Sequence, residues 1–179
     1  MDIEVWDTTF IRARRAEVHP VLADPGTYGG WWPGAVSQGT PARARIVLRP
    51  PTLLGRRQRL VMEVTKNRRD LGVDFLVSGD LDGRGEWFYL DEPSGVVVNY
   101  VLRARVPDRR WRATLRDHRA AVRSALEALK DRLEGSRIPG EEPDRRLLED
   151  QQAAMAAFKA GVEAHARKLA AEREAQHDG

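Results

Sequence analysis

The sequence predicts an α+β fold in which a curved antiparallel sheet of seven strands surrounds one long helix. Three observations lead to this prediction. Short segments with period-two alternation follow one another, separated by turns that contain glycine and proline. One long stretch with helical periodicity comes after them, at residues 108–134. The connections between the alternating segments are too short for parallel pairing, which needs crossovers of a dozen or more residues.

The N-terminal part predicts one strand followed by two short helices. Residues 4–14 alternate and are rich in aromatic and β-branched side chains, as is typical of a strand. Residues 16–25 predict a short helix, and Pro20 within it should either fall in the first turn or make the helix irregular. Residues 27–32 can form a second short helical turn.

The remaining six strands follow between residues 35 and 106. Five of them are bounded by turn-forming residues and are expected at about Ala42–Arg49, Gln58–Lys66, Leu71–Ser78, Arg84–Leu90 and Val96–Val106. A shorter strand near Ala35–Gln38 completes the sheet. Gly83-Arg84-Gly85 is interpreted as a hairpin feature, because it lacks the third glycine and the following helix of a dinucleotide-binding loop.

The long helix carries one apolar stripe, at spacings of three, four and seven residues: Trp111, Leu115, Val122, Leu126, Leu129 and Leu133. Asp108 is the expected N-terminal cap and Gly135 the expected end. A helix of about 25 residues is long enough to close a sheet. The sequence therefore divides into a domain at 1–135, a linker at 136–142 and an extension at 143–179.

The extension predicts a second amphipathic helix. Its apolar residues recur every seven positions, at Leu148, Met155, Val162 and Leu169, with Phe158 and His165 between them. The stripe is thin and rich in alanine, so the helix needs a partner surface. That surface can belong to the same domain, to a second copy of the chain in a homo-oligomer, or to another protein.

Composition excludes several kinds of chemistry. The chain of 179 residues contains no cysteine, which rules out disulfides, thiolate nucleophiles and cysteine-based zinc sites and fits a cytoplasmic location. No apolar run approaches the roughly 18–20 residues that span a bilayer. The N-terminus lacks the features of a signal peptide. The four histidines are not at metal-ligand spacing, so no metal and no cofactor is expected.

Arginine concentrates in one part of the chain, at Arg103, Arg105, Arg109, Arg110, Arg112, Arg116, Arg119 and Arg123. Such a cluster could face an anionic ligand, a membrane surface or a nucleic acid. The simpler interpretation is that the aliphatic stems cover apolar surface while the charged heads stay in water. With a formal net charge of only +3, no nucleic-acid partner is expected.

Several motifs together resemble one superfamily. Tyr28-Gly29-Gly30-Trp31-Trp32-Pro33-Gly34 follows the first short helix. Later motifs are Val77-Ser78-Gly79-Asp80-Leu81-Asp82-Gly83-Arg84-Gly85-Glu86-Trp87, Gly95-Val96-Val97-Val98-Asn99-Tyr100, and Arg116-Asp117-His118 on the closing helix. With these motifs, residues 1–135 resemble the START-like superfamily, in particular its bacterial polyketide cyclase/dehydrase-type branch, the SRPBCC proteins.

The resemblance implies a helix-grip fold, in which the sheet curls around the long helix and two small helices lie near the entrance. Members of the superfamily hold lipids, sterols, polyketides and similar molecules in the cavity, and some are aromatase/cyclases. Fold alone does not fix the chemistry. The motifs therefore imply a cavity without naming its ligand.

Such a cavity needs apolar walls and a few polar groups that orient the ligand. The ligand-binding candidates are Tyr28, Trp31, Trp32, Met62, Phe75, Trp87, Tyr89, Asn99, Leu115, His118 and Val122. For each of them, ordinary core packing is the alternative. Alternation alone does not decide which face of each strand turns inward.

The candidates for catalysis are His118, Arg103 and Tyr100. His118 lies on the apolar stripe of the long helix, where an imidazole could act as acid or base, or could be a hydrogen-bonded core residue. Asn99 and Arg103 share a strand face and could orient a carboxylate or phenolate if that face turned inward. If the face turns outward, they are exposed surface residues.

The leading hypothesis is a protein that binds a small hydrophobic or aromatic, lipid- or polyketide-like ligand between sheet and helix. A second hypothesis is a polyketide cyclase/aromatase-type enzyme that uses the same cavity, and catalysis by positioning needs no nucleophile. A third is an interaction protein in which the helix at 143–175 drives assembly and the interior is filled by Trp31, Trp87 and Phe75.

Overall fold

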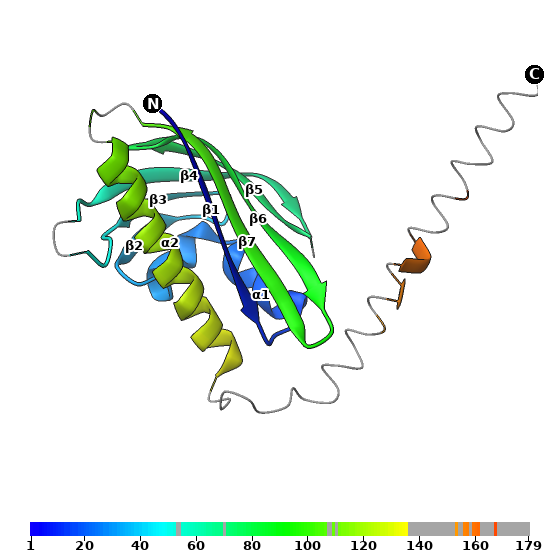
Figure 1. The fold of residues 1–179 in the computed structure, drawn as a ribbon. Coiled ribbons are helices and arrows are strands. Elements are labelled where there is room, and N and C mark those ends of the chain that lie inside the picture. The colour runs from blue at the N-terminus through cyan, green and yellow to red at the C-terminus, as the bar shows by residue number, and fades with distance from the viewer. Residues whose placement is uncertain are drawn as a thin grey trace, which may run out of the picture.

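The computed structural model describes residues 1–52, 55–69, 71–106, 109 and 111–135, together with 153, 156–157, 159–161 and 167. Its elements are β1 (Asp2–Ile11), α1 (Arg15–Leu22), the 3-10 helix η1 (Pro25–Gly30), β2 (Ala35–Gly39), β3 (Arg43–Leu48), β4 (Gln58–Arg68), β5 (Gly72–Gly79), β6 (Asp82–Glu92), β7 (Gly95–Arg105) and α2 (Trp111–Glu134). The predicted α+β fold is confirmed (Figure 1). Outside the described residues lie the cap Asp108, the linker 136–142 and the stripe of the extension: Leu148, Met155, Phe158, Val162, His165 and Leu169.

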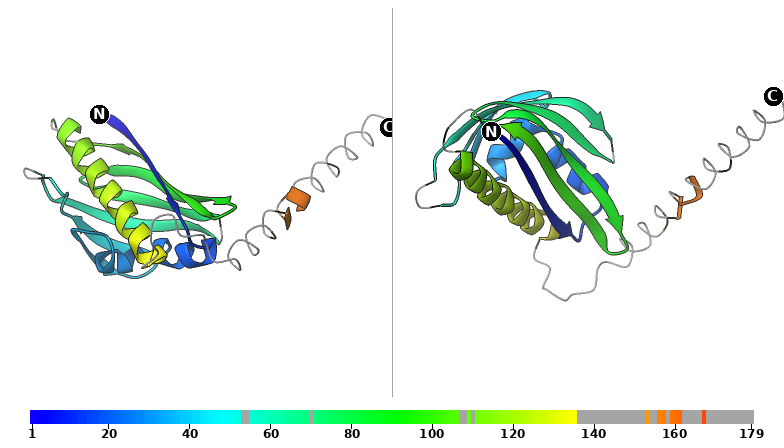
Figure 2. Two further views of the ribbon diagram at one scale, coloured as in Figure 1. Left: turned by 60° about the horizontal axis from the view of Figure 1, so that its bottom comes forward. Right: turned by 45° about the horizontal axis from the view of Figure 1, so that its top comes forward.

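The strands form one antiparallel sheet in the order β1-β7-β6-β5-β4-β3-β2. Strands β2 to β7 pair with their neighbours in the chain, and β1 pairs with the free side of β7. The sheet is bent, and α2 lies across its concave side together with the short helices (Figure 2). Strands β1 and β2 are therefore the two edges, and the helix-grip arrangement is confirmed.

Helix α2 runs alongside the edge strand β1 in the same direction. Arg119 donates to the Glu4 carbonyl at 3.3 Å, Arg123 pairs with Asp7 at 3.0 Å, and Lys130 donates to the Phe10 carbonyl at 2.9 Å. These contacts advance together along both elements. The helix is thus held to β1 by its flank while its apolar stripe covers the sheet.

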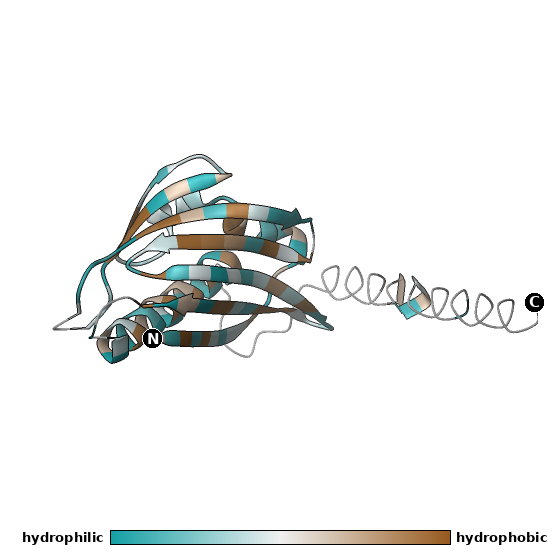
Figure 3. Cartoon of the chain, turned by 90° about the horizontal axis from the view of Figure 1, so that it is seen from above, coloured by the Kyte–Doolittle hydropathy of each residue, from teal (hydrophilic) through white to brown (hydrophobic). Residues whose placement is uncertain are grey.

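The structure settles which strand faces turn inward. On β7 the inward side chains are Val96, Val98, Tyr100, Leu102 and Ala104, all buried; on the outer face Arg103 and Arg105 are exposed and Asn99 is buried. On β6, Trp87 and Tyr89 are buried, and Leu90 is exposed. Polar and apolar residues alternate along the strands accordingly (Figure 3).

Helix α1 begins at Arg15, so Pro20 lies beyond its first turn, and one helical hydrogen bond is lost at this proline. The N-terminal end of α1 is stabilised because the Glu17 carboxylate accepts from the Arg14 N–H at 2.7 Å. Gly83 and Gly85 lie in β6, just after the turn of the β5–β6 hairpin, and neighbouring groups leave no space for a side chain at either position.

We expect Gly85→Ala to lower the free energy of unfolding by about 1–3 kcal/mol, because the added methyl group overpacks the core. A Cβ at this position would lie 2.5 Å from Cε2 of Phe75 and 2.6 Å from the Val101 carbonyl oxygen. The matched control is Gly30→Ala, where a Cβ would meet no atom within 4 Å. Urea denaturation measures both, and equal losses would contradict the packing described here.

Candidate functional site

The space between the sheet and α2 contains a cluster of aromatic side chains. The rings of Trp87 and Tyr100 are 4.6 Å apart between centroids, and Phe75 stacks on Tyr100 at 6.0 Å. Trp32 meets Trp87 edge-on at 6.3 Å. Four of the most deeply buried side chains of the described residues belong to this cluster: Tyr28, Phe75, Trp87 and Tyr100. The interior of the fold is therefore predominantly aromatic.

A chain of hydrogen bonds crosses this interior. It runs from β7 to α2, then to β4, and returns to α2. The Tyr100 hydroxyl lies 3.0 Å from Nε2 of His118, and Nδ1 of His118 lies 2.9 Å from Oε1 of Gln58. Nε2 of Gln58 donates to the Thr114 carbonyl at 2.9 Å. Since that carbonyl can only accept, it fixes the orientation of the Gln58 amide. Nδ1 of His118 therefore carries the proton, and the Tyr100 hydroxyl donates to Nε2.

Burial keeps both titratable members of this chain neutral. It lowers the pKa of His118 from 6.5 to about 4, since the imidazolium would lose its hydration. Burial also raises the pKa of Tyr100 far above its ordinary value. At neutral pH the pair is a neutral phenol that donates to a neutral imidazole. Such a pair orients the two side chains through their hydrogen bond and carries no charge.

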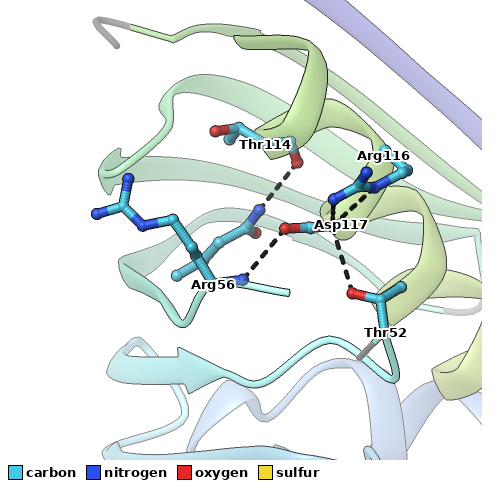
Figure 4. Close-up of polar contacts among 6 residues, drawn as sticks. Thr52, Arg56, Thr114, Arg116 and Asp117 are labelled. Carbon is cyan, nitrogen blue, oxygen red and sulfur yellow. Dashed lines mark hydrogen bonds and ion pairs between the residues drawn. The ribbon is translucent and has the colours of Figure 1, made fainter. Parts of the chain in front are cut away.

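Asp117, one residue before His118, fastens the segment between β3 and β4 to α2 (Figure 4). Its buried carboxylate accepts from the Thr52 hydroxyl at 3.4 Å, the Arg56 N–H at 3.2 Å and the Arg116 guanidinium at 2.9 Å. Arg56 is two residues before Gln58, whose side chain orients His118. Asp117 thus positions the start of β4 and, through it, the buried hydrogen-bond chain.

Helix η1 closes one end of the interior. The Tyr28 hydroxyl donates to the Leu22 carbonyl at 2.7 Å and accepts from Nε1 of Trp87 at 3.0 Å. Trp31 and Trp32 follow η1, and both side chains are buried. The indole N–H groups of Trp31 and Trp32 are also buried, and neither has a hydrogen-bond partner among the described residues. Nε of Arg68 and Nδ2 of Asn99 are the other buried side-chain polar atoms without a partner among the described residues.

Nine of the eleven predicted ligand-binding residues lie together in the buried interior: Tyr28, Trp31, Trp32, Met62, Phe75, Trp87, Tyr89, His118 and Val122. Leu115 is only partly buried and lies at the margin of the core. Asn99 is on the outer face of the sheet, where Nε1 of Trp6 donates to its Oδ1 at 3.5 Å. Arg103 is on the same face and pairs with Glu4 at 3.0 Å. The interior therefore contains His118 and Tyr100 but neither Asn99 nor Arg103.

Sequence reasoning missed three polar residues of the interior. Gln58 and Asp117 orient and anchor His118, and Nδ1 of His19 lies 3.3 Å from the Tyr89 hydroxyl. Gln58 follows two arginines and precedes a third, which suggests an exposed segment. Asp117 adjoins the apolar stripe of α2, and an aspartate on a helix flank gives no sign of burial.

Three hollows lined by described residues lie on the outside of the fold. Two on the outer face of the sheet measure about 860 and 320 Å³ and share Leu76, Arg84 and Arg103. A third, of about 610 Å³, lies along α2 beside Pro51 and Leu115. Arg116 and Arg123 of α2 pair with Asp117 and Asp7, and both arginine side chains stay more than half exposed.

In the part of the chain that the structure describes, no group of three or more His, Asp or Glu side chains could hold a metal ion. None of the described helices is both long enough and apolar enough to cross a membrane.

No protein-family model and no curated protein matches the sequence. Solved structures match the fold. A START superfamily protein from Mycobacterium smegmatis has a TM-score of 0.58 at 15% identity, covering 73% of this chain and 97% of its own. The Zhui aromatase/cyclase from Streptomyces sp. R1128 has a TM-score of 0.57 at 15% identity, with coverage of 78% and 99%. A conserved protein from Geobacillus kaustophilus has a TM-score of 0.60 at 13% identity, with coverage of 75% and 97%. The expected resemblance is confirmed at the level of the fold.

The buried state of His118 predicts a pH dependence of stability. The lowered pKa means that the unfolded chain binds a proton between about pH 6.5 and pH 4 while the folded protein does not. Stability is therefore complete above about pH 6.5 and falls as the pH drops. The loss from this residue between pH 7 and pH 5 is about 2 kcal/mol. His118→Gln should lack this component in urea unfolding at the two pH values; an identical pH dependence in both proteins would contradict the assignment.

We expect Asp117→Asn to lower the free energy of unfolding by about 1–3 kcal/mol. Thr52 and Arg116 donate to one carboxylate oxygen and Arg56 to the other, and asparagine keeps only one acceptor oxygen, so one set of donors would face an amide N–H. Asp80→Asn is the control: Asp80 is exposed and accepts a single backbone N–H, from Arg59 at 2.7 Å. Thermal unfolding compares the two variants with the parent. A loss no larger for Asp117→Asn than for Asp80→Asn would show that the buried carboxylate does not anchor the segment.

Proposed function

We propose that the protein binds a small apolar or aromatic molecule that carries an oxygen acceptor, at the end of the interior closed by η1. The observation that supports this most directly is the pair of buried, unpartnered indole N–H groups of Trp31 and Trp32. Buried donors in native proteins nearly always have a partner, and leaving one without an acceptor costs about 1–3 kcal/mol. A ligand oxygen would supply the missing acceptor.

The surroundings of these donors define the chemistry of the ligand. The Tyr28 ring lies 5.2 Å from that of Trp31 and 5.6 Å from that of Trp32, and the two indoles are 5.8 Å apart. Flat aromatic walls offer large apolar contact and few polar groups. A molecule that matches them is flat or flexible, mostly apolar, and bears a carbonyl or phenolic oxygen. Lipid- and polyketide-like compounds share these properties.

Helix η1 is the element that we expect to open for the ligand. It is only six residues long, and the Tyr28 side chain anchors it in the core. The Ser37 hydroxyl holds it to β2, accepting from the Gly29 N–H at 2.7 Å and donating to the Gly26 carbonyl at 2.8 Å. Short elements and loops open locally at a lower free energy than core strands and long helices. Movement of η1 carries Trp31 and Trp32 with it and gives access to the interior.

Binding accounts for the polar groups better than catalysis does. His118 has both ring nitrogens engaged within the protein, and burial keeps it unprotonated. The cyclase/aromatase-type alternative would use Tyr100 and His118 for proton transfer, and the fold shared with the Zhui aromatase/cyclase supports it. The burial of Trp31, Trp87 and Phe75 is what an interaction protein with a filled interior would show. The two unsatisfied donors are what favours a ligand over that alternative.

The test uses two probes of the same shape, 2-acetonaphthone and 2-ethylnaphthalene, of which only the ketone offers an acceptor. Isothermal titration calorimetry should show tighter binding of the ketone by about tenfold, equivalent to about 1.4 kcal/mol. Trp31→Phe with Trp32→Phe should remove this preference, since phenylalanine keeps the apolar wall without the N–H. Trp6→Phe, which changes an exposed indole, should preserve it. Equal affinities for both probes in the parent protein would refute the role of the indoles.

A further inference from the structure

The outer face of the sheet, opposite α2, bears an apolar patch, which we call the outer strip: Trp6, Phe10, Phe88, Leu90, Val97 and Val101. Trp6 pairs with Val101, and Val97 pairs with both Phe10 and Leu90; Thr8 and Asn99 pair between these two rows, and Phe88 lies beside Asn99. Trp6 is 61% exposed and Leu90 is 53% exposed, and the other four are partly exposed. An antiparallel sheet with one face in water normally presents polar residues there.

The outer strip is a bounded patch and not a general property of this face. Further along the same strands the outward residues are charged, with Glu4 paired to Arg103 at 3.0 Å and Arg105 paired to Asp2 at 3.4 Å. Contiguous exposed apolar residues with a polar rim mark a surface that contacts another element or molecule.

The end of α2 is fixed next to this strip. Nζ of Lys130 lies 5.8 Å from the centroid of the Phe10 ring, and the Glu134 carboxylate accepts from the Arg12 N–H at 2.9 Å. These contacts hold the last turn of α2 against the end of β1, an edge strand of the sheet (Figure 1). The outer strip begins directly around that edge, at Phe10.

We propose that the segment Leu148–Leu169, whose described residues are exposed in the structure, packs on the outer strip of its own domain in solution. Its apolar residues recur every seven positions, as an amphipathic helix that needs a partner surface requires. As a helix, the stretch from Met155 to Val162 would be about 10 Å long. The outer strip from Trp6 to Phe10 spans about 13 Å. Two turns of the helix thus match the length of the patch.

The connection is long enough for this packing. The fourteen residues from Glu134 to Leu148 can reach up to about 46 Å, which is ample to round the edge strand. A tethered segment also meets its own domain at a high effective concentration, and this favours packing in cis over packing on a second copy. The extension then covers the face of the sheet that α2 leaves exposed.

The test uses the full chain, whose lack of cysteine allows a single reporter thiol. Thr8→Cys places it on the exposed outer face of β1 beside the strip, and Gln38→Cys places it on the exposed edge strand β2. Maleimide labelling at Thr8→Cys should be about tenfold slower than at Gln38→Cys, which corresponds to a docking free energy of about 1.4 kcal/mol. This protection should not change between low and high protein concentration.

Two pairs of substitutions in the extension identify what covers the thiol. Met155→Glu with Val162→Glu should abolish the protection, since both charges fall on the apolar stripe. Ala153→Glu with Ala160→Glu adds the same charges to the opposite side of the predicted helix and should leave protection intact. Equally fast labelling at both thiols would show that the strip is uncovered. Protection that increases with concentration, together with a dimer mass in solution, would assign the strip to a second copy; either result overturns the proposal.

Discussion

The arrangement of this fold depends on the buried hydrogen-bond chain from Tyr100 through His118 and Gln58 to Thr114. It joins the middle of β7, the interior face of α2 and the first residue of β4. Each member is buried away from water or lies at the margin of the core, so each polar atom must find its partner within the protein. A shift of α2 by one residue would leave several of these groups unsatisfied. These hydrogen bonds therefore fix the position of α2 on the sheet. The hydrogen bonds of Asp117, the residue before His118, add to this constraint.

The two ends of the interior differ in how completely their polar groups are satisfied. In the hydrogen-bond chain around His118, the polar side-chain atoms of Tyr100, His118 and Gln58 all have a partner, and burial holds His118 and Tyr100 neutral. Around Trp31 and Trp32 two indole donors lack an acceptor. Satisfied networks rigidify a core, whereas unpartnered donors leave binding energy available to a ligand. The same aromatic interior thus has an end under α2 whose polar groups are satisfied and an end under η1 with two unsatisfied donors.

Much of the fold follows from the sequence, because alternation and turn residues place the seven strands, and one helical stripe places α2. The inward faces could not be assigned, since β6 carries large apolar residues on both faces: Trp87 and Tyr89 on one, Phe88 and Leu90 on the other. Phe88 and Leu90, the outward residues that made the two faces look alike, belong to the outer strip. His118 was placed correctly by its position on the stripe. Gln58 and Asp117 were not, because their burial arises from contacts between segments distant in the chain.

The most direct measurement of the central claim is the NMR signal of the indole N–H groups, of which the chain has five. Single Trp→Phe variants assign each signal. On addition of 2-acetonaphthone, the account predicts that the Trp31 and Trp32 signals move downfield, as they do on gaining an acceptor, and that the Trp6 signal stays in place. Unchanged signals for Trp31 and Trp32 at saturating ketone would contradict a ligand site under η1.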